Sequence, residues 1–166
     1  MNSNDLTISA HGERAIVMTR AFNAPRHMVF DALTKPELLK RWLGVRGGWT
    51  LAVCEVDLKV GGEYHFVWHH KARALEMGTR GVYREIVSPV RLVHTESFDV
   101  AWYDGESLST TVLVEQGGGT TLTTTLSYES PEARAAVLRS PMESGVTEKS
   151  YDMLAELLAA PRPGEL

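Results

Sequence analysis

Hydrophobic and polar residues alternate strictly over residues 15–22, and Arg20 is the one polar residue on the otherwise apolar side. A repeat of two residues is typical of a β-strand with one buried face. After Pro25 the apolar residues recur at intervals of three and four instead. This change predicts two short helices, the first ending near Leu33 and the second closed by Gly44.

Over the next eighty or so residues the pattern indicates strands interrupted by turns. The interruptions are Val60-Gly61-Gly62, Ser88-Pro89-Val90 and Gln116-Gly117-Gly118-Gly119. Glycine can adopt positive φ values and proline fixes φ, so both favour tight connections between strands. The flanking runs are rich in β-branched and aromatic residues, which favour strands. We therefore predict three antiparallel hairpins, over residues 51–69, 77–98 and 109–128.

The C-terminal part of the sequence is helical in pattern. Ser130-Pro131 and Ser140-Pro141 each place a capping serine before a proline, which suits the first turn of a helix. From Pro141 onward apolar residues recur at helical spacing until Pro161, which predicts a long amphipathic helix. This helix is the only element available to cover the apolar face of the sheet.

These elements predict an α+β fold. A sheet of this length twists and curves around whatever covers its apolar face. We expect a curved antiparallel sheet, with two short helices and a long C-terminal helix, to enclose an apolar cavity. The predicted organisation is a flexible N-terminal segment over 1–14, one domain over 15–160, and a C-terminal tail over 161–166.

Composition narrows the range of functions. The chain has 166 residues, a size that favours one hydrophobic core, and 43% of them are hydrophobic. Its net charge is -4 and no stripe of Lys and Arg is present, which argues against a nucleic-acid partner. No apolar run is long enough to span a membrane. The one cysteine, Cys54, fits a reducing compartment, so we expect a cytoplasmic protein.

Five segments together carry a resemblance to a known family. They are Ala24–Thr34, Glu37–Gly44, Cys54–Gly62, Gly81–Ile86 and Arg91–Val93. In combination they resemble homologues of the activator of the heat-shock-protein ATPase, within the START-like and birch-pollen-allergen-like superfamily (SRPBCC) that is also called polyketide cyclase-like. The resemblance extends from about Thr19 to about Leu158.

The resemblance implies a helix-grip fold with an internal apolar cavity. It implies no single activity, because members of the superfamily bind lipids or other apolar ligands and some catalyse cyclisation or hydrolysis. Related sequences often have a second Trp at the position of Leu43 and a Trp at the position of Val146. Smaller side chains beside a cavity enlarge it or let neighbours collapse inward, so ligand size is not carried over.

Candidate ligand-binding residues are those expected on the inward faces of the sheet and of the long helix. They are Trp42, Trp49, His65, Val67, Met77, Gly81, Tyr83, Phe98, Val112, Leu122, Thr124, Met142, Val146 and Met153. The inward phase is assumed, since a slip of one residue along a strand turns every side chain to the other face. The alternative for most of the aliphatic residues is plain core packing.

Polar anchors for a ligand are expected at His65, Tyr83, Arg20 and Glu96, each on an otherwise apolar strand region. For Arg20 and Glu96 the favoured alternative is an ordinary cross-strand ion pair. If the protein is an enzyme, His65 would be the general base and Tyr83 or Glu96 the acid or orienting group.

No metal or other cofactor is expected. His69 and His70 are adjacent on a strand and point to opposite faces, so both would rarely bind one ion. Cys54 has no neighbouring cation or helix N-terminus in the sequence pattern that would activate it, and we expect a structural thiol.

Three functions follow from this reading. The leading one is binding of a small hydrophobic ligand, with a role in stress response and no assigned catalysis. The alternatives are a cyclase- or hydrolase-type enzyme acting on a small apolar carbonyl compound in the same cavity, and a co-chaperone-like partner of a heat-shock protein. A homodimer is also left open.

Overall fold

The computed structural model describes residues 5–139 and 141–159, and for 141–147 it describes the backbone alone. The strands are β1 (Thr7–His11), β2 (Ala15–Phe22), β3 (Trp49–Val56), β4 (Glu63–His70), β5 (Leu75–Val87), β6 (Arg91–Phe98), β7 (Ser107–Gln116) and β8 (Gly119–Ser127). The helices are α1 (Arg26–Thr34), α2 (Pro36–Trp42), α3 (Pro131–Arg139) and α4 (Pro141–Ala159). The predicted tail over 161–166 lies outside the described residues.

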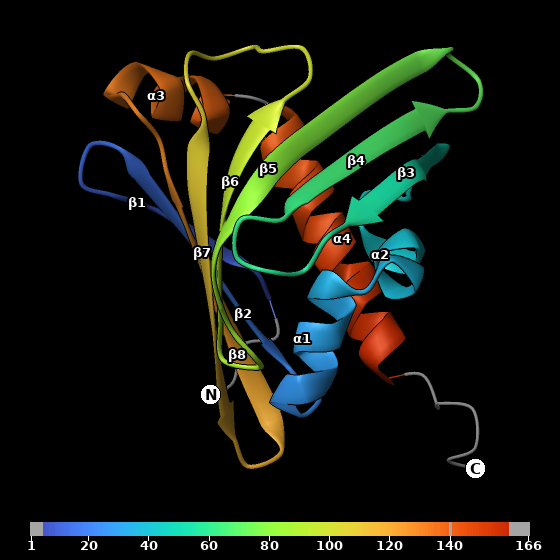
Figure 1. Cartoon of the computed structure of the whole chain (residues 1–166), viewed down its shortest axis with the longest axis vertical. Helices are drawn as coiled ribbons and strands as arrows, with labels where there is room; N and C mark the ends of the chain where they lie inside the picture. The colour runs from blue at the N-terminus through green and yellow to red at the C-terminus, as the bar shows by residue number, and fades with distance from the viewer. Residues whose placement is uncertain (1–4, 140, 160–166) are drawn as a thin grey trace.

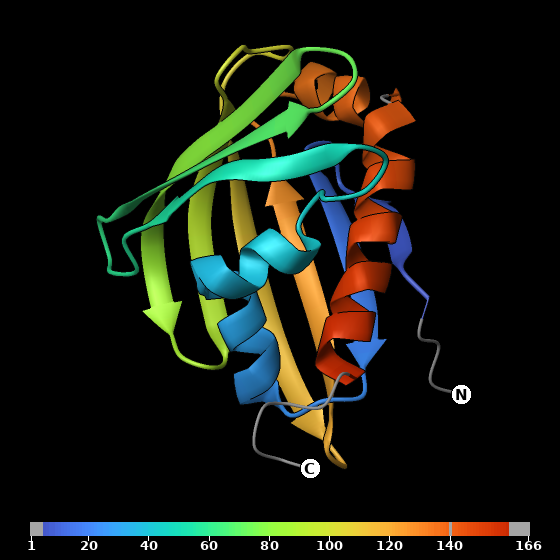
Figure 2. The same cartoon turned by 90° about the vertical axis from the view of Figure 1, so that its right-hand side faces the viewer.

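All eight strands join one antiparallel sheet in the order β1-β2-β8-β7-β6-β5-β4-β3. Figure 1 shows the sheet curved into a V-shaped trough, with β1, β2, β7 and β8 on one side and β3, β4 and β5 on the other. Helices α1, α2 and α4 lie inside the trough, and Figure 2 shows them side by side across its mouth. The predicted α+β helix-grip architecture is confirmed.

Strand β1 corrects the prediction of a flexible segment over residues 1–14. Each of its residues pairs in register with β2, from Thr7 opposite Thr19 to His11 opposite Ala15. All five side chains are exposed, although the sequence Thr-Ile-Ser-Ala-His alternates polar and apolar residues, so a signal for this short strand was present and was not used. It is an edge strand at one end of the sheet.

The main core lies between the trough and α4. Leu154 of α4 and Leu122 of β8 are 0% exposed, and both belong to a cluster with Trp42 of α2. Trp42 stacks on Tyr151 of α4 with a centroid separation of 6.0 Å. Complete burial of one leucine side chain contributes about 1.5–3 kcal/mol, so this cluster holds α4 against α1 and α2.

Two hydrogen bonds join the end of α2 to the elements around it. The indole Nε1 of Trp68 donates to the Leu43 carbonyl at 2.8 Å, and the Gly44 amide donates to Ser150 Oγ of α4 at 3.1 Å. The C-terminal end of α2 is therefore tied both to β4 and to α4.

Helix α3 covers a second, smaller core at the other end of β2. Ala133 and Val137 of α3 pack there with Ile16, Met18 and Leu126. As the sequence predicted, Ser130 caps this helix, because its Oγ accepts a hydrogen bond from the Ala133 amide at 3.0 Å. No helix in the described ranges is both long and apolar enough to cross a bilayer.

Candidate functional site

A row of polar side chains crosses the concave face of the sheet. Tyr83 of β5 pairs with His94 of β6, and His94 pairs with Ser109 of β7. Directly paired residues of antiparallel strands project from the same face. The row continues through Leu126 and Ile16, which belong to the core under α3 and identify the face as concave. We call Tyr83, His94 and Ser109 the polar row.

Hydrogen bonds at His94 define which of its ring nitrogens carries the proton. Nδ1 lies 3.1 Å from the Thr95 carbonyl oxygen and 3.1 Å from Tyr64 Oη. A carbonyl oxygen only accepts, so Nδ1 must be the donor. The Tyr64 hydroxyl donates to the same carbonyl at 2.6 Å, which leaves its oxygen able to accept from His94. In the neutral ring Nε2 therefore presents a lone pair.

Burial sets the protonation states of this group of side chains. It lowers the pKa of His94, and the hydrogen bond from its ring to the Thr95 carbonyl opposes this shift only in part, so the imidazole is neutral near pH 7. Burial also raises the pKa of Tyr64, with a further contribution from Glu96, and raises the pKa of Tyr83. Both phenols therefore keep their protons and can donate hydrogen bonds.

All three members of the polar row have a polar atom without a hydrogen-bond partner among the described residues. These atoms are Tyr83 Oη, His94 Nε2 and Ser109 Oγ. Tyr83 is 3% and Ser109 4% exposed, so both residues are buried as a whole. Buried polar groups in proteins are usually hydrogen-bonded, and an unpaired one marks a place where a ligand or water completes the structure.

Polar and aromatic side chains surround the row. On one side Thr111 and Thr124 bond each other through their hydroxyls at 2.9 Å, and on the other side Glu96 pairs with Ser107. The Tyr64 ring lies 5.5 Å from that of Tyr83 and 5.0 Å from that of His94, measured between centroids. The polar row is therefore flanked by the aromatic ring of Tyr64 and by the hydroxyl groups of Thr111 and Thr124.

Gly81 allows Tyr64 to reach the polar row. A Cβ atom at this position would lie 1.8 Å from the Thr95 carbonyl oxygen and 2.6 Å from Tyr64 Cε1. Only a residue without a side chain permits this approach of β6 and of the Tyr64 ring. Gly81, which was predicted to line the cavity, therefore lies directly beneath the ring of Tyr64.

His65, the predicted general base, lies on the opposite, convex face, so its prediction as a cavity anchor is wrong. It pairs with the exposed Arg80, whereas its neighbour Tyr64 faces the row. His65 Nε2 is 2.7 Å from Asp99 Oδ2, and Arg80 Nε donates to Asp99 Oδ1 at 2.7 Å. Its observed role is to tie the segment after β6 to β4 and β5.

The pair with Arg80 makes Asp99 a source of pH-dependent stability. The hydrogen bond from Arg80, aided by His65, holds the pKa of Asp99 below its usual value of about 3.9. Because the folded-state pKa is depressed, this stabilisation is complete above pH 3.9 or so and is lost as the pH falls through the folded-state pKa. We expect Asp99→Asn to lower the urea midpoint at pH 7, and the difference from wild type to close in acid.

A matched control for this prediction is Asp104→Asn in the same loop, where the side chain is exposed. Its urea midpoint should follow that of the wild type at every pH. A deficit of Asp99→Asn that persisted unchanged in acid would contradict the assigned role of the carboxylate.

Val67 and Val112 are also on the convex face, so both are wrong as lining residues. Val67 shares the face of His65, two residues away on β4. Val112 pairs with Thr123, whereas its neighbours Thr111 and Leu113 are the buried, inward residues of β7. In each strand the assumed phase was one residue out, which turns the side chain to the other face.

The remaining predicted lining residues with described side chains lie on the concave side or on helices that pack there. They are Trp42, Trp49, Met77, Tyr83, Phe98, Leu122, Thr124 and Met153. Trp42 and Leu122 are fully engaged in the core, Phe98 packs on Trp102 and Tyr103, and only Tyr83 belongs to the polar row. The side chains of Met142 and Val146 lie outside the described part, as does the surface of α4 that they would form. The enclosed apolar cavity therefore stays a prediction.

Arg20 pairs with α4 and not with a neighbouring strand. Its Nη1 lies 2.6 Å from Asp152 Oδ1. The predicted cross-strand pair with Glu96 is wrong, because β8 and β7 separate β2 from β6. Glu96 lies on the concave face of β6, two residues after His94, and pairs with Ser107 of β7.

His94 is the residue that sequence reasoning missed. A usable signal was present, since His94 lies two residues before Glu96 on the same strand and must share its face. The other candidates have structural partners: His69 contacts Glu76 at 3.1 Å, and His70 Nε2 lies 2.9 Å from the Gly47 carbonyl oxygen. Burial raises the pKa of the Cys54 thiol, which makes it a poorer nucleophile.

The curved antiparallel sheet, with α4 packed against its concave face, defines a helix-grip protein of the α+β class. The family model described as Activator of Hsp90 ATPase homolog 1-like protein matches residues 23–159, and the chain belongs to this family. No curated protein matches the chain.

Solved structures show the same architecture. A Rhodobacter sphaeroides protein is 32% identical, with coverage of 95% of this chain and 99% of that one and a TM-score of 0.86. A Chromobacterium violaceum protein is 25% identical, covers 90% and 100% of the two chains and has a TM-score of 0.74. A Mycobacterium smegmatis protein at 18% identity, covering 95% and 99%, has a TM-score of 0.81 and shows the fold alone.

Proposed function

We propose that the protein binds a small, mostly apolar molecule that carries a hydroxyl or carbonyl group, held against the polar row and covered by α4. The observation that carries this proposal is the set of three neighbouring polar atoms, Tyr83 Oη, His94 Nε2 and Ser109 Oγ, which lie on buried or partly buried residues and have no partner among the described residues. A core built only for stability would satisfy or omit such groups, because each costs about 1–3 kcal/mol when left unpaired.

The chemistry of the row indicates what kind of ligand group it would accept. Tyr83 donates, the lone pair of His94 Nε2 accepts, and Ser109 can do either. A ligand hydroxyl could therefore donate to His94 while it accepts from Tyr83, and a carbonyl could accept from Tyr83 or Ser109. The aromatic rings around the row favour an apolar or aromatic body for the ligand.

A modest affinity is expected. Burial of roughly 200 Å² of apolar ligand surface contributes about 5 kcal/mol before the cost of ordering, and hydrogen bonds to the row add to this. These terms support dissociation constants in the micromolar range.

The proposal predicts selective loss of binding in a polar-row variant. Thermal-shift and native mass-spectrometry screens with aromatic hydroxy and keto compounds, fatty acids and sterols should find saturable binders. For the best hydroxyl-bearing binder, His94→Phe should weaken binding about tenfold, since the ligand hydroxyl loses its acceptor inside the protein.

His69→Phe is the matched control, because the same substitution there changes a histidine that is exposed and paired with Glu76. Its affinity for the ligand should equal that of the wild type. The absence of any saturable binder across the panel, or equal effects of the two variants, would refute the proposal.

A catalytic use of the same site is the second candidate, and the tautomer of His94 favours it. A neutral imidazole with a free Nε2 lone pair beside two protonated tyrosines has the components of general acid–base catalysis on a bound carbonyl compound. His94→Gln should then abolish turnover of a bound carbonyl ligand. A ligand recovered chemically unchanged after long incubation with the wild type would leave binding as the sole function.

A further inference from the structure

Strand β1 is an open edge of the sheet, and Figure 1 shows it at the outer end. The opposite edge strand, β3, packs against α2 and contains a bulge between Leu51 and Val53. A helix cover and a bulge both protect an edge from pairing with another chain, as do prolines and charged side chains. The sequence of β1 has no proline, Lys, Arg, Asp or Glu, and its register with β2 is unbroken. Strand β1 is therefore the less protected of the two edges.

The pattern of backbone hydrogen bonds shows which residues of β1 present polar groups at this edge. In an antiparallel sheet, successive residues direct their N–H and C=O groups to opposite sides of the strand. The Tyr128 amide donates to the Arg14 carbonyl at 2.9 Å, so Arg14 is directed to β8 and the residue after it to β1. That next residue pairs with His11, so His11 and every second residue before it bond to β2. Ile8 and Ala10 therefore direct their amide and carbonyl groups to the open edge.

The side chains of the same two residues lie on the concave face. Ile8 pairs with Met18 and Ala10 with Ile16, and both partners belong to the core under α3. Ile8 is nevertheless 41% exposed. A second strand laid along β1 would therefore complete backbone hydrogen bonds and also cover apolar surface.

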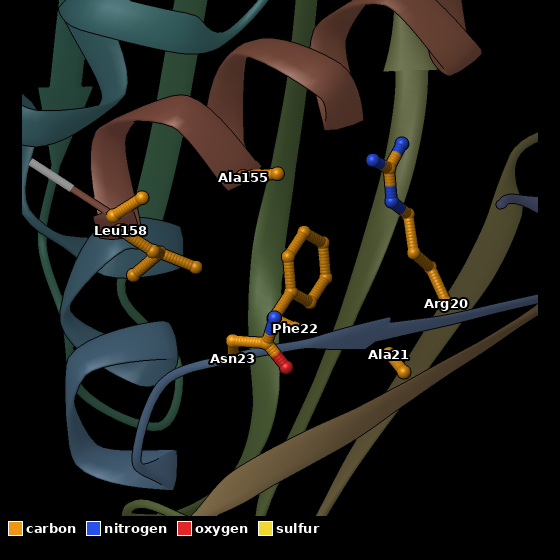
Figure 3. Close-up of a pocket in the computed structure, with 7 residues that line it drawn as sticks. Arg20, Ala21, Phe22, Asn23, Ala155 and Leu158 are labelled. Carbon is orange, nitrogen blue, oxygen red and sulfur yellow. The ribbon is translucent and has the colours of Figure 1, made fainter. Parts of the chain in front are cut away.

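The hairpin that carries this edge is held in place on both sides. Arg134 Nη1 of α3 donates to the Gly12 carbonyl in the turn between β1 and β2 at 2.7 Å. Figure 3 shows Arg20 and Phe22 of β2 directed toward α4, with Leu158 across a pocket from them. A strand that is already fixed loses little conformational entropy when it pairs with another.

We propose that β1 pairs with β1 of a second copy of this chain, antiparallel and about a twofold axis, so that the two sheets become one. An interface of this kind uses the same strand of both subunits. The backbone groups of Ile8 and Ala10 have to meet one another across the axis. The axis must therefore pass beside Ile8, Ser9 or Ala10.

Side-chain complementarity selects the axis at Ile8, because this axis sets apolar residues against each other and an acid against an imidazole. The opposed pairs are Ile8 with Ile8, Leu6 with Ala10, and Asp5 with His11. An axis at Ser9 would set Asp5 against Glu13 of the partner subunit, and like charges directly opposite each other repel. An axis one residue further along would set Ile8 against Gly12 of the partner subunit, which offers no side chain.

A weak, reversible dimer is expected. Two paired strands of five residues bury well under the roughly 1,200 Å² of a stable protein–protein interface. The dissociation constant should therefore be about 100 μM, and the chain should be a monomer at about 1 μM.

Sedimentation equilibrium of the full chain between about 10 μM and 1 mM measures this association. The average mass should rise with concentration from that of the monomer toward twice that value. Over the same range, hydrogen exchange at the amides of Ile8 and Ala10 should slow. Exchange at Thr7, Ser9 and His11 should not change, since β2 already binds their amides.

Charged substitutions at Ile8 test the register. Ile8→Lys and Ile8→Glu should each stay monomeric, because like charges would face each other at the axis. An equimolar mixture of the two variants should recover the dimer, since an ammonium group then faces a carboxylate. Val114→Lys is the matched control, because Val114 is an exposed valine on β7, inside the sheet, and this variant should dimerise as the wild type does.

Four outcomes would overturn the inference. They are a wild type that stays monomeric at about 1 mM, a dimer that survives Ile8→Lys, a mixture of the two Ile8 variants that stays monomeric, and slowed exchange outside β1 only. A monomeric wild type would leave this edge to a strand of another protein. The exchange measurement uses the wild type, so it decides the matter even if an Ile8 variant fails to fold. None of these results bears on ligand binding at the polar row, which His94→Phe tests separately.

Discussion

Replacement of Leu154 by alanine is expected to lower the free energy of unfolding by about 2–5 kcal/mol. Leu154 is 0% exposed and projects from α4 into the cluster that contains Trp42 and Phe22. The truncated side chain leaves a cavity where the helix meets the rest of the core, and the ring contacts of Tyr151 with Trp42 and Phe22 resist its collapse. Urea denaturation followed by tryptophan fluorescence measures the loss.

Leu157→Ala is the matched control on the same helix. Leu157 is only partly buried, and it packs at the edge of the same cluster. Its truncation should cost clearly less than that of Leu154. Equal losses for the two variants would mean that α4 is not held through its Leu154 face.

A second large effect is expected for Gly81→Ala, which should lower stability by about 1–3 kcal/mol and also weaken ligand binding at the polar row. The new Cβ would lie 1.8 Å from the Thr95 carbonyl oxygen, so β6 must move. That carbonyl accepts the hydrogen bonds that place Tyr64 and His94. Urea denaturation and the affinity of the best ligand report the two effects separately.

Gly119→Ala provides the comparison, since Gly119 also lies in a strand. There the nearest atom to the new Cβ is the Phe22 carbonyl oxygen at 3.2 Å, a contact that needs only a small adjustment. We expect a much smaller change in stability and none in ligand affinity. A Gly81→Ala protein as stable as Gly119→Ala, with unchanged affinity, would contradict the proposed packing of Tyr64.

Sequence periodicity was sufficient for most of the fold because each predicted element carries its own local signal. In β2 the buried residues alternate strictly with less buried ones, and Ser130 caps α3 as its sequence indicates. Strand β1 was not predicted although its five residues alternate between polar and apolar, because the pattern is short and its pairing depends on β2. The pairing partners of an edge strand are a property of tertiary structure.

The site was harder to predict because polar side chains face inward there and apolar side chains face solvent. On β7 the inward residues include Ser109 and Thr111, while Val112 and Val114 face outward, and Val114 is 56% exposed. A rule that places valine inside and serine outside selects the wrong face of such a strand. On β4 a usable pattern was present, since Tyr64, Phe66 and Trp68 share the concave face and His65 lies on the other face, where Val67 is the one apolar residue.

The pairing of β2 with β8 has a consequence for the synthesis of this protein. Ala15 lies opposite Ser127 and Phe22 opposite Thr120, so about a hundred residues separate the two strands along the chain. Such non-local pairings form late, because the entropy of closing a long loop must be overcome first. During synthesis on the ribosome, β2 therefore keeps its apolar side exposed until β8 has emerged. The nascent chain is most prone to aggregate during that interval.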